Sequence, residues 1–175
     1  MKSIIMFNKN NYFIDRTIKH IRKVQDNMIY LEENKYLLSF KVKEFELLRR
    51  SLKHDLSKFS KNLINGYIDL TEYYYNKDNN ISNNHINIDK IRNVADIHCN
   101  KEKHHPNNKI KMSNIDLCEM CSDLAAMSFE KNEDNYTDYF LNKQIKNFKF
   151  LEKYKNKILN ILLILENFDK NHNYK

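Results

Sequence analysis

The pattern of apolar and polar residues predicts helices along most of the chain. Between Phe13 and Tyr36, apolar residues recur every three or four positions, which is the period of one face of an α-helix. Comparable patterns follow as far as the C-terminal region, where apolar residues are again dense. The expected helices cover residues 13–36, 38–52, 57–75, 86–98 and 113–128, with one or two more between 136 and about 168.

Breaks in the pattern separate these helices. The polar stretch 76–84 predicts a mobile loop, and Pro106 predicts a helix end because the residue before a proline disfavours the α conformation. Ser113 with Asp116 three positions later resembles a capping box. No internal repeat or linker is visible, so we expect one compact helical domain over residues 1–175, built from about six to seven helices.

Glycine and proline are nearly absent from the sequence. The chain of 175 residues has one glycine, Gly66, and one proline, Pro106. Dinucleotide and P-loop folds need clustered glycines so that the backbone can approach phosphate, and β-sandwiches and barrels need frequent turns. These classes are therefore disfavoured, and the composition predicts an all-α protein. A protein of this composition that handles phosphate would have to do so through side chains and metal rather than through a glycine-rich loop.

Charge and cysteine content restrict the partners and the compartment. The chain carries 30 basic and 23 acidic residues, for a net charge of +7, but its lysines are scattered among asparagine and glutamate. This favours a solubilising surface over a nucleic-acid site. Transmembrane-length apolar runs and a signal-peptide core are not seen, and three cysteines without framework spacing suit a reducing compartment. We expect a cytoplasmic protein that does not bind membranes.

The histidines and aspartates form the main candidate for chemistry. His20 lies between Ile18 and Val24 on the apolar face of the first expected helix, and His98 continues an apolar face in the fourth. Asp123 also lies among apolar residues, where a carboxylate costs several kcal/mol unless it is paired or bound to metal. Imidazole and carboxylate together suit divalent transition metals.

Structural interpretations of the same residues stay open. A histidine on an apolar face is commonly a core residue with satisfied hydrogen bonds. Asp116, Glu119 and Asp123 share one helical face at i, i+3 and i+7, a pattern typical of a solvated acidic stripe.

The cysteines allow a different metal site. Cys118 and Cys121 form a Cys-x₂-Cys pair that could join His104 and His105 in a structural zinc site. A second such pair is missing, and both cysteines lie among apolar residues in the middle of an expected helix. The pattern therefore favours reduced thiols in the core.

The order of the candidate residues resembles the HD-domain superfamily of metal-dependent phosphohydrolases. Those all-helical proteins assemble a site as His…His-Asp…Asp from separate helices, and their two-metal variant reads His…His-Asp-x-x-Lys…His…His-His…Asp. The corresponding residues here are His20, His54, Asp55, Lys58, His98, His104, His105 and Asp123. Over residues 19–126 the chain looks closer still to a small, poorly characterised family of HD-like phage and bacterial proteins with a domain-of-unknown-function name.

The resemblance implies a role for each of these residues. Two divalent ions (Mn, Fe, Co, Ni or Zn) would share Asp55 as bridging ligand, and Asp55 and Lys58 would serve catalysis. The first ion would take His20, His54 and Asp123, and the second His98, His104 and His105. Glu119, one turn before Asp123, would be an outer-shell carboxylate that orients a ligand.

Some positions depart from the pattern of those families. Leu124 follows the metal-type aspartate where the small family has tryptophan, and Asn107 follows His-His-Pro where it has glutamate. The Gly-Tyr-Pro signature of the cyclic-dinucleotide phosphodiesterases is absent, so their substrate is not implied.

The function implied is metal-dependent hydrolysis of a small phosphorylated substrate, a nucleotide or a related phosphomonoester or phosphodiester, by metal-activated water. Two alternatives stay open. The same ligands hold two irons in HD-type diiron oxygenases, and ligand identity alone does not separate the two reactions. The chain could also be a non-enzymatic module, with a structural metal and a basic surface that binds nucleic acid or a partner protein.

Overall fold

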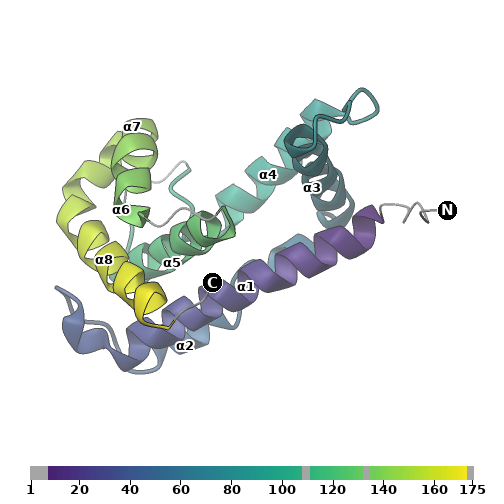
Figure 1. The fold of residues 1–175 in the computed structure, drawn as a ribbon. Coiled ribbons are helices and arrows are strands. Elements are labelled where there is room, and N and C mark those ends of the chain that lie inside the picture. Colours follow the sequence, from purple (N-terminus) through teal and green to yellow (C-terminus); the bar gives the residue numbers. More distant parts are fainter. Residues whose placement is uncertain (1–7, 108–110, 132–134, 173–175) are drawn as a thin grey trace. The chain divides into compact units, whose positions relative to one another are not determined.

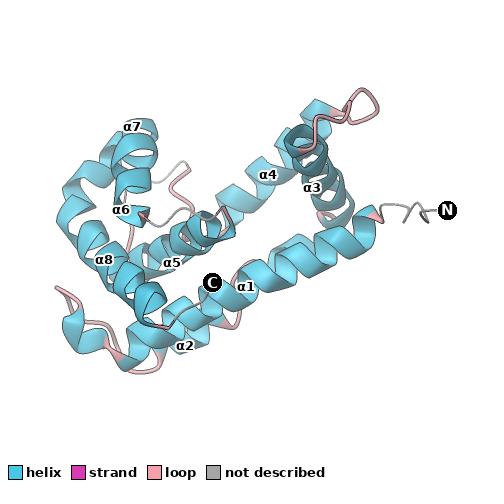
Figure 2. Cartoon of the chain, in the orientation of Figure 1, coloured by secondary structure: helices cyan, strands magenta, loops and turns pink. Residues whose placement is uncertain are grey.

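The computed structural model describes residues 8–107, 111–131 and 135–172. Within these ranges every regular element is a helix (Figures 1 and 2). The prediction of an all-α fold is confirmed. None of the helices in these ranges is both long enough and apolar enough to cross a membrane.

The helices vary from single turns to twenty-five residues (Figure 1). In chain order they are α1 (Lys9–Glu33), η1 (Lys35–Leu37), α2 (Glu46–Ser51), η2 (Leu56–Phe59), α3 (Ile64–Asp78), α4 (Ile88–Lys101), α5 (Asn114–Glu130), α6 (Tyr136–Tyr139), η3 (Phe140–Gln144), α7 (Ile145–Asn147), η4 (Lys149–Tyr154) and α8 (Lys155–Asn171). Of these, η1, η2 and η4 are 3₁₀-helices and η3 is a π-helix.

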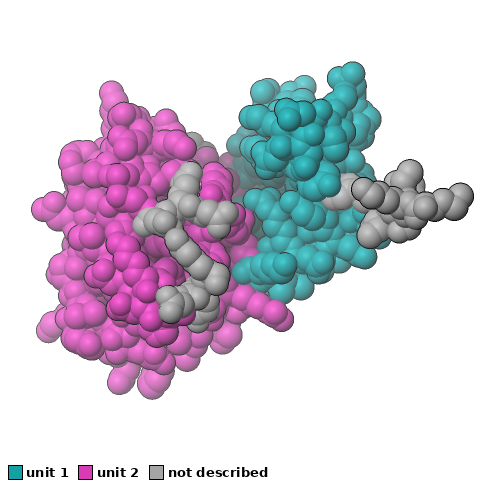
Figure 3. All heavy atoms as spheres, in the orientation of Figure 1, with its two compact units in different colours: residues 1–19, 56–98 teal, residues 20–55, 99–175 magenta. Residues whose placement is uncertain are grey.

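Two compact units make up the fold (Figure 3). Unit 1 combines the described part of residues 1–19 with Leu56–His98, and unit 2 combines His20–Asp55 with the described part of residues 99–175. The helix α1 therefore contributes its first part to unit 1 and the remainder to unit 2. The single domain expected over 1–175 stays a prediction.

The one glycine marks a close crossing of helices in unit 1. Gly66 on α3 is buried, and a Cβ atom built on it would lie 2.2 Å from Cγ2 of Val94 on α4. The small core around this crossing contains Phe13, Leu63 and Tyr67 as well as Val94. Any larger side chain at position 66 would collide with Val94, which explains the glycine.

The polar stretch expected to form a mobile loop is partly ordered by side chains. Residues 76–78 extend α3, and the loop proper begins at Asn79. The Asn76 amide donates to Asn83 Oδ1 at 3.0 Å, and the Asn83 amide donates to the Tyr73 carbonyl at 3.1 Å. The asparagines thus hold the loop against the end of α3.

The core of unit 2 surrounds α5, which α8 packs against (Figure 1). Most of α5 is buried, so this helix is covered on nearly all sides rather than along one stripe. Cys118 and Cys121 are completely buried there, and burial raises the pKa of Cys118 to about 12 and that of Cys121 well above its usual value. Both thiols are protonated core residues at neutral pH, as expected.

The N-terminus of α5 has the predicted capping box. The Ser113 hydroxyl accepts from the Asp116 amide N–H at 3.2 Å, and the Ser113 N–H donates to Asp116 Oδ2 at 2.9 Å. This cap fixes where α5 begins and therefore the register of the acidic residues that follow it.

The expected helix over 38–52 is much shorter in the structure. It is reduced to α2, because Phe45 adopts a left-handed conformation (φ 59°) that starts a new helix. Phe45 has no capping side chain, and Glu32 at the end of α1 replaces it. The Glu32 carboxylate accepts from the Phe45 N–H at 2.9 Å and from the Leu47 N–H at 3.1 Å. A distant residue thus caps α2.

Candidate metal centre

The His-Asp pair lies in a sharp turn after α2. His54 and Asp55 are both 1% exposed, and Asp55 has φ 58°, in the left-handed region. Aspartate enters this region at lower cost than most residues, and such strained conformations cluster at functional sites. Lys58 was expected near the start of the third helix, but it lies in η2, and α3 begins only at Ile64.

The helix α5 contributes three carboxylates to one side. Glu119, Asp123 and Glu130 lie at i, i+4 and i+11, so they share a helical face. Glu119 is 1% exposed and Asp123 8% exposed. This burial excludes a solvated acidic stripe at these two positions, and each carboxylate requires a partner.

Carboxylates lie beside the Nδ1 atoms of three buried histidines, within hydrogen-bond distance for His20 and His54 and within ion-pair distance for His104. Glu119 Oε1 lies 3.1 Å from Nδ1 of His54 and 3.3 Å from Nδ1 of His104. Glu130 Oε1 lies 2.6 Å from Nδ1 of His20. An Nδ1–H that donates to a carboxylate fixes the tautomer whose Nε2 carries a lone pair, the form that binds metal.

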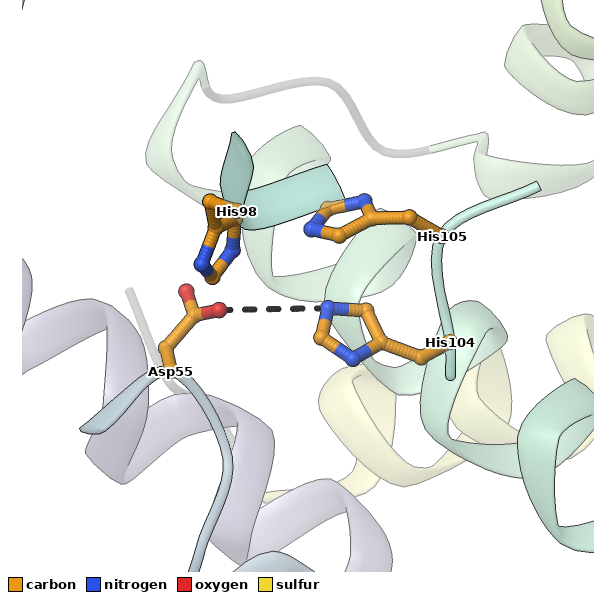
Figure 4. Close-up of side chains that lie close together, drawn as sticks. All are labelled: Asp55, His98, His104 and His105. Carbon is orange, nitrogen blue, oxygen red and sulfur yellow. Dashed lines mark ion pairs between the residues drawn. The ribbon is translucent and has the colours of Figure 1, made fainter. Parts of the chain in front are cut away.

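The Nε2 atoms of these histidines converge on two carboxylates. The distance from His20 Nε2 to Asp123 Oδ1 is 3.0 Å, and that from His54 Nε2 to Asp55 Oδ2 is 3.6 Å. His104 Nε2 lies 3.8 Å from both Asp55 Oδ1 and Asp123 Oδ2. Figure 4 shows the His104 ring and the Asp55 carboxylate facing each other.

The separations of His54 and His104 from these carboxylates suit ligands around an ion better than hydrogen-bonded pairs, whereas His20 Nε2 is within hydrogen-bond distance of Asp123 Oδ1. Distances of 3.6–3.8 Å are too long for a hydrogen bond. Ligands bound at about 2.0–2.2 Å to a common ion lie roughly 3–3.5 Å apart, so a small contraction would bring these atoms into a coordination shell. His54 Nε2 makes no hydrogen bond within the described structure although it is buried, as a ligand atom would be.

The charges of the centre follow from its pairing. Burial disfavours the ionised form of Glu119, but hydrogen bonds with His104 and His54 and the charge of Arg50 outweigh burial and lower its pKa to about 2. Burial also opposes ionisation of Asp123, yet His20 and the other histidines lower its pKa. For His104, burial alone would lower the pKa, but the nearby carboxylates of Glu119 and Asp123 have the larger combined effect. The pKa of His104 is therefore raised above its usual value. Buried negative charge thus faces the imidazoles.

Two groups of side chains in unit 2 could hold a metal ion. His20, His54 and Asp123 form one, and His54, His104 and Glu119 form the other; within each, ligand atoms lie within 4.8 Å of one another and all residues are buried. In the second group, the Glu119 carboxylate faces the Nδ1 atoms of His54 and His104 rather than their Nε2 atoms. The first group is therefore the better candidate for an ion site. Among the described residues, neither cysteine of the alternative zinc site belongs to such a group.

The remaining predicted residues divide between the units. His105 lies beside His104, with ring centroids 4.1 Å apart, just before the buried Pro106 (Figure 4). His98, also drawn there, is the last residue of unit 1; its Nδ1 lies 2.9 Å from Ser57 Oγ. In the same unit, Lys58 Nζ lies 5.5 Å from the centroid of the Tyr67 ring. The metal role of His98 and the catalytic role of Lys58 stay predictions.

Sequence reasoning missed two residues of the centre, Arg50 and Glu130. Arg50 Nε lies 2.5 Å from Glu119 Oε2, and Arg50 Nη2 donates to Asp116 Oδ1 at 2.8 Å. The spacing contained a signal for both: Arg50 precedes His54 by four residues, and Glu130 follows Asp123 by seven, two helical turns on the same face.

A comparison with protein-family models shows which family the chain belongs to. A family model described as a family of unknown function (DUF5662) matches residues 9–165. The chain belongs to this family. The matched region of this DUF5662 member contains every residue of the centre, and membership agrees with the expected likeness to a family named as a domain of unknown function. No curated protein and no solved structure matches the chain.

Proposed function

We propose that this DUF5662 member is a metal-dependent phosphohydrolase of the HD type. The observation that carries the proposal is the convergence of three imidazole Nε2 atoms on the carboxylates of Asp55 and Asp123. These residues follow one another in the order of the HD pattern, and they come from separate helices and turns. Burying so many titratable groups together lowers the stability of the fold unless a shared ligand, such as a metal ion, compensates for their lost hydration.

The residues fit divalent transition ions. His20, His54, Asp55 and Asp123 supply nitrogen and oxygen ligands for one ion, and His104 and His105 begin a second set that the sequence pattern completes with His98. We propose two ions chosen from Mn, Fe, Co, Ni and Zn, all of which accept this mixture of ligands. When bound, such ions activate water and neutralise charge on a phosphoryl group.

The chain's own side chains would prepare this chemistry. Glu119 and Glu130 keep the histidine Nε2 lone pairs aimed at the centre through their contacts with Nδ1. The buried surroundings strengthen the attraction between ligands and cations because solvent screening is weak there. Lys58 would offset negative charge on a phosphorylated substrate, such as a nucleotide, as the resemblance implies.

The first prediction tests the centre by removing Asp55. Protein purified without chelators should contain bound metal by elemental analysis, and with Mn²⁺, Co²⁺ or Ni²⁺ it should hydrolyse an aryl phosphate or a member of a nucleotide panel. Asp55→Ala and the backbone-compatible Asp55→Asn should lose at least about a hundredfold in activity, since both remove a central ligand charge. Asp89→Ala, at an exposed aspartate, is the matched control.

Two results would count against hydrolysis. Full activity in both Asp55 variants would show that another group, or a contaminant, performs the reaction. Oxygen consumption by iron-loaded protein, with no phosphatase activity under any metal, would instead assign the centre to a diiron oxygenase.

A further inference from the structure

A second site in unit 2 is a pocket of about 430 Å³. The residues that line it are Glu46, Arg49, Arg50, Lys53, Lys101, Glu102, Lys103, Ile115 and Glu119. Histidine is not among the described residues that line this pocket. Glu119 belongs to both sites: its Oε1 contacts the histidine Nδ1 atoms, and its Oε2 contacts Arg50.

Several cations of the pocket have no acidic partner among the described residues. Arg50 is paired with Asp116 and Glu119. The other four cations of the lining form no ion pair within the described structure: Arg49, Lys53, Lys101 and Lys103. Several surface lysines outside this pocket are paired; Lys9, for example, lies 3.0 Å from Glu72. A concave surface that gathers unpaired cations is a binding site for anions.

We propose that this pocket binds an oligophosphate chain, either free or as the di- or triphosphate of a nucleotide. Arg49 and Lys53 come from α2 and the turn after it, whereas Lys101 and Lys103 come from the end of α4 and the turn after it. Two pairs of cations on separate segments match an anion with several linked charged groups better than a single phosphate. Arg49 adds a planar fork suited to phosphate oxygens.

The acidic residues of the lining argue against nucleic acid as the ligand. Glu46 and Glu102 stand among the cations, so the positive charge is confined to the pocket rather than extended as a stripe. A long polyanion would meet these carboxylates, while a short chain can lie between the cations. The volume is within the roughly 300–1,000 Å³ range of small-molecule pockets.

Arg50 connects this pocket with the metal centre. It lines the pocket and holds Glu119, which in turn contacts His54 and His104. An anion that draws Arg50 away from Glu119 would loosen the support of these two histidines. Binding of oligophosphate and binding of metal should therefore change each other's affinity by the same factor, as linkage requires.

The test measures anion binding to the metal-free protein, so it is independent of the proposed hydrolysis. Calorimetric titration of the chelator-treated full chain should show tripolyphosphate binding more tightly than orthophosphate. Lys53→Gln with Lys103→Gln should weaken tripolyphosphate binding by about tenfold or more, because two charge-assisted contacts with the anion are lost. The control, Lys146→Gln with Lys149→Gln, removes two exposed charges of unit 2 outside the pocket and should change binding less than about twofold.

The same titrations separate the alternatives. A nucleoside triphosphate that binds more tightly than tripolyphosphate identifies a nucleotide as the source of the chain, and equal affinities identify free oligophosphate. The proposal is overturned if Asp55→Asn abolishes binding while the pocket variant does not, if both lysine pairs weaken binding equally, or if single-stranded RNA outcompetes tripolyphosphate. Circular dichroism confirms that each variant is folded.

Discussion

Glu119 is the residue on which most of the centre depends. One carboxylate contacts two histidine Nδ1 atoms and an arginine while being 1% exposed. Sequence alone suggested an outer-shell role from its position one turn before Asp123. The structure adds that it supports two imidazoles at once and that Arg50 neutralises it.

The second prediction concerns this positioning role. Glu119→Gln keeps the shape but loses the negative charge that faces the Nδ1 atoms of His54 and His104, so affinity for Mn²⁺ or Zn²⁺ should fall about 10–100-fold. Competition with a fluorescent chelator measures this change, and Glu152→Gln, at an exposed residue, is the control. An unchanged metal affinity in a folded, destabilised variant would reduce Glu119 to a structural residue.

The residues proposed as ligands could be picked out from the sequence because their residue types already indicate the chemistry. His20, His54, Asp55 and Asp123 are residue types that bind metal, and their order matches a known pattern. Arg50 and Glu130 were not predictable in the same way, because arginine and glutamate are common surface residues. Their spacing from His54 and Asp123 was a weak signal, and only burial and distances show which groups they contact.

At the scale of elements, helices with strong periodicity were predicted well and short ones were not. The long pattern beginning near Phe13 became α1, and Ser113 capped α5 as expected. The 38–52 pattern failed because its N-cap comes from Glu32, a contact between residues far apart in sequence. Local periodicity carries no information on such a cap.

The third prediction tests this distant cap. Glu32→Ala should cost about 1–2 kcal/mol of unfolding free energy, because two N–H groups at the start of α2 lose their acceptor. Urea denaturation measures the loss. Glu33→Ala, at the exposed neighbouring residue, should remain within about 0.5 kcal/mol of the original protein. Equal costs in the two variants would show that the Glu32 contacts contribute nothing specific.

The fourth prediction concerns the crossing of α3 and α4. Gly66→Ala should destabilise the protein by about 1–3 kcal/mol through its collision with Val94, less about 1 kcal/mol gained in helix propensity. Adding Val94→Ala removes the collision, so the double variant should be less destabilised than the sum of the single changes. Asn65→Ala, at an exposed position on the same helix, is the control. Strict additivity would contradict the close approach.

At the scale of the whole molecule, the division into two units was not visible in the sequence. The described part of residues 1–19 and residues 56–98 form one unit although more than thirty positions separate them along the chain. No linker or change in composition marks the boundary, because α1 continues through it as one helix. Grouping of this kind depends on contacts between distant segments, which periodicity does not record.

The fifth prediction links metal to global stability. An ion that binds the folded chain at 1,000 times its dissociation constant adds about 4 kcal/mol of stability, which for a chain of this size raises the melting temperature by on the order of 10 °C. Differential scanning fluorimetry with Mn²⁺ or Zn²⁺ should show this rise. It should be lost in Asp123→Asn and kept in Asp89→Asn. An equal rise in both variants would place the ion elsewhere.

The left-handed turn at Asp55 has a consequence for how the sequence can vary. The position must satisfy the backbone, which favours glycine, asparagine or aspartate, and it must also present a carboxylate. Glutamate would keep the charge but suits the backbone poorly, while glycine would suit the backbone and lose the charge. Aspartate alone meets both demands. As long as the protein uses this centre, we therefore expect every substitution at position 55 to be selected against.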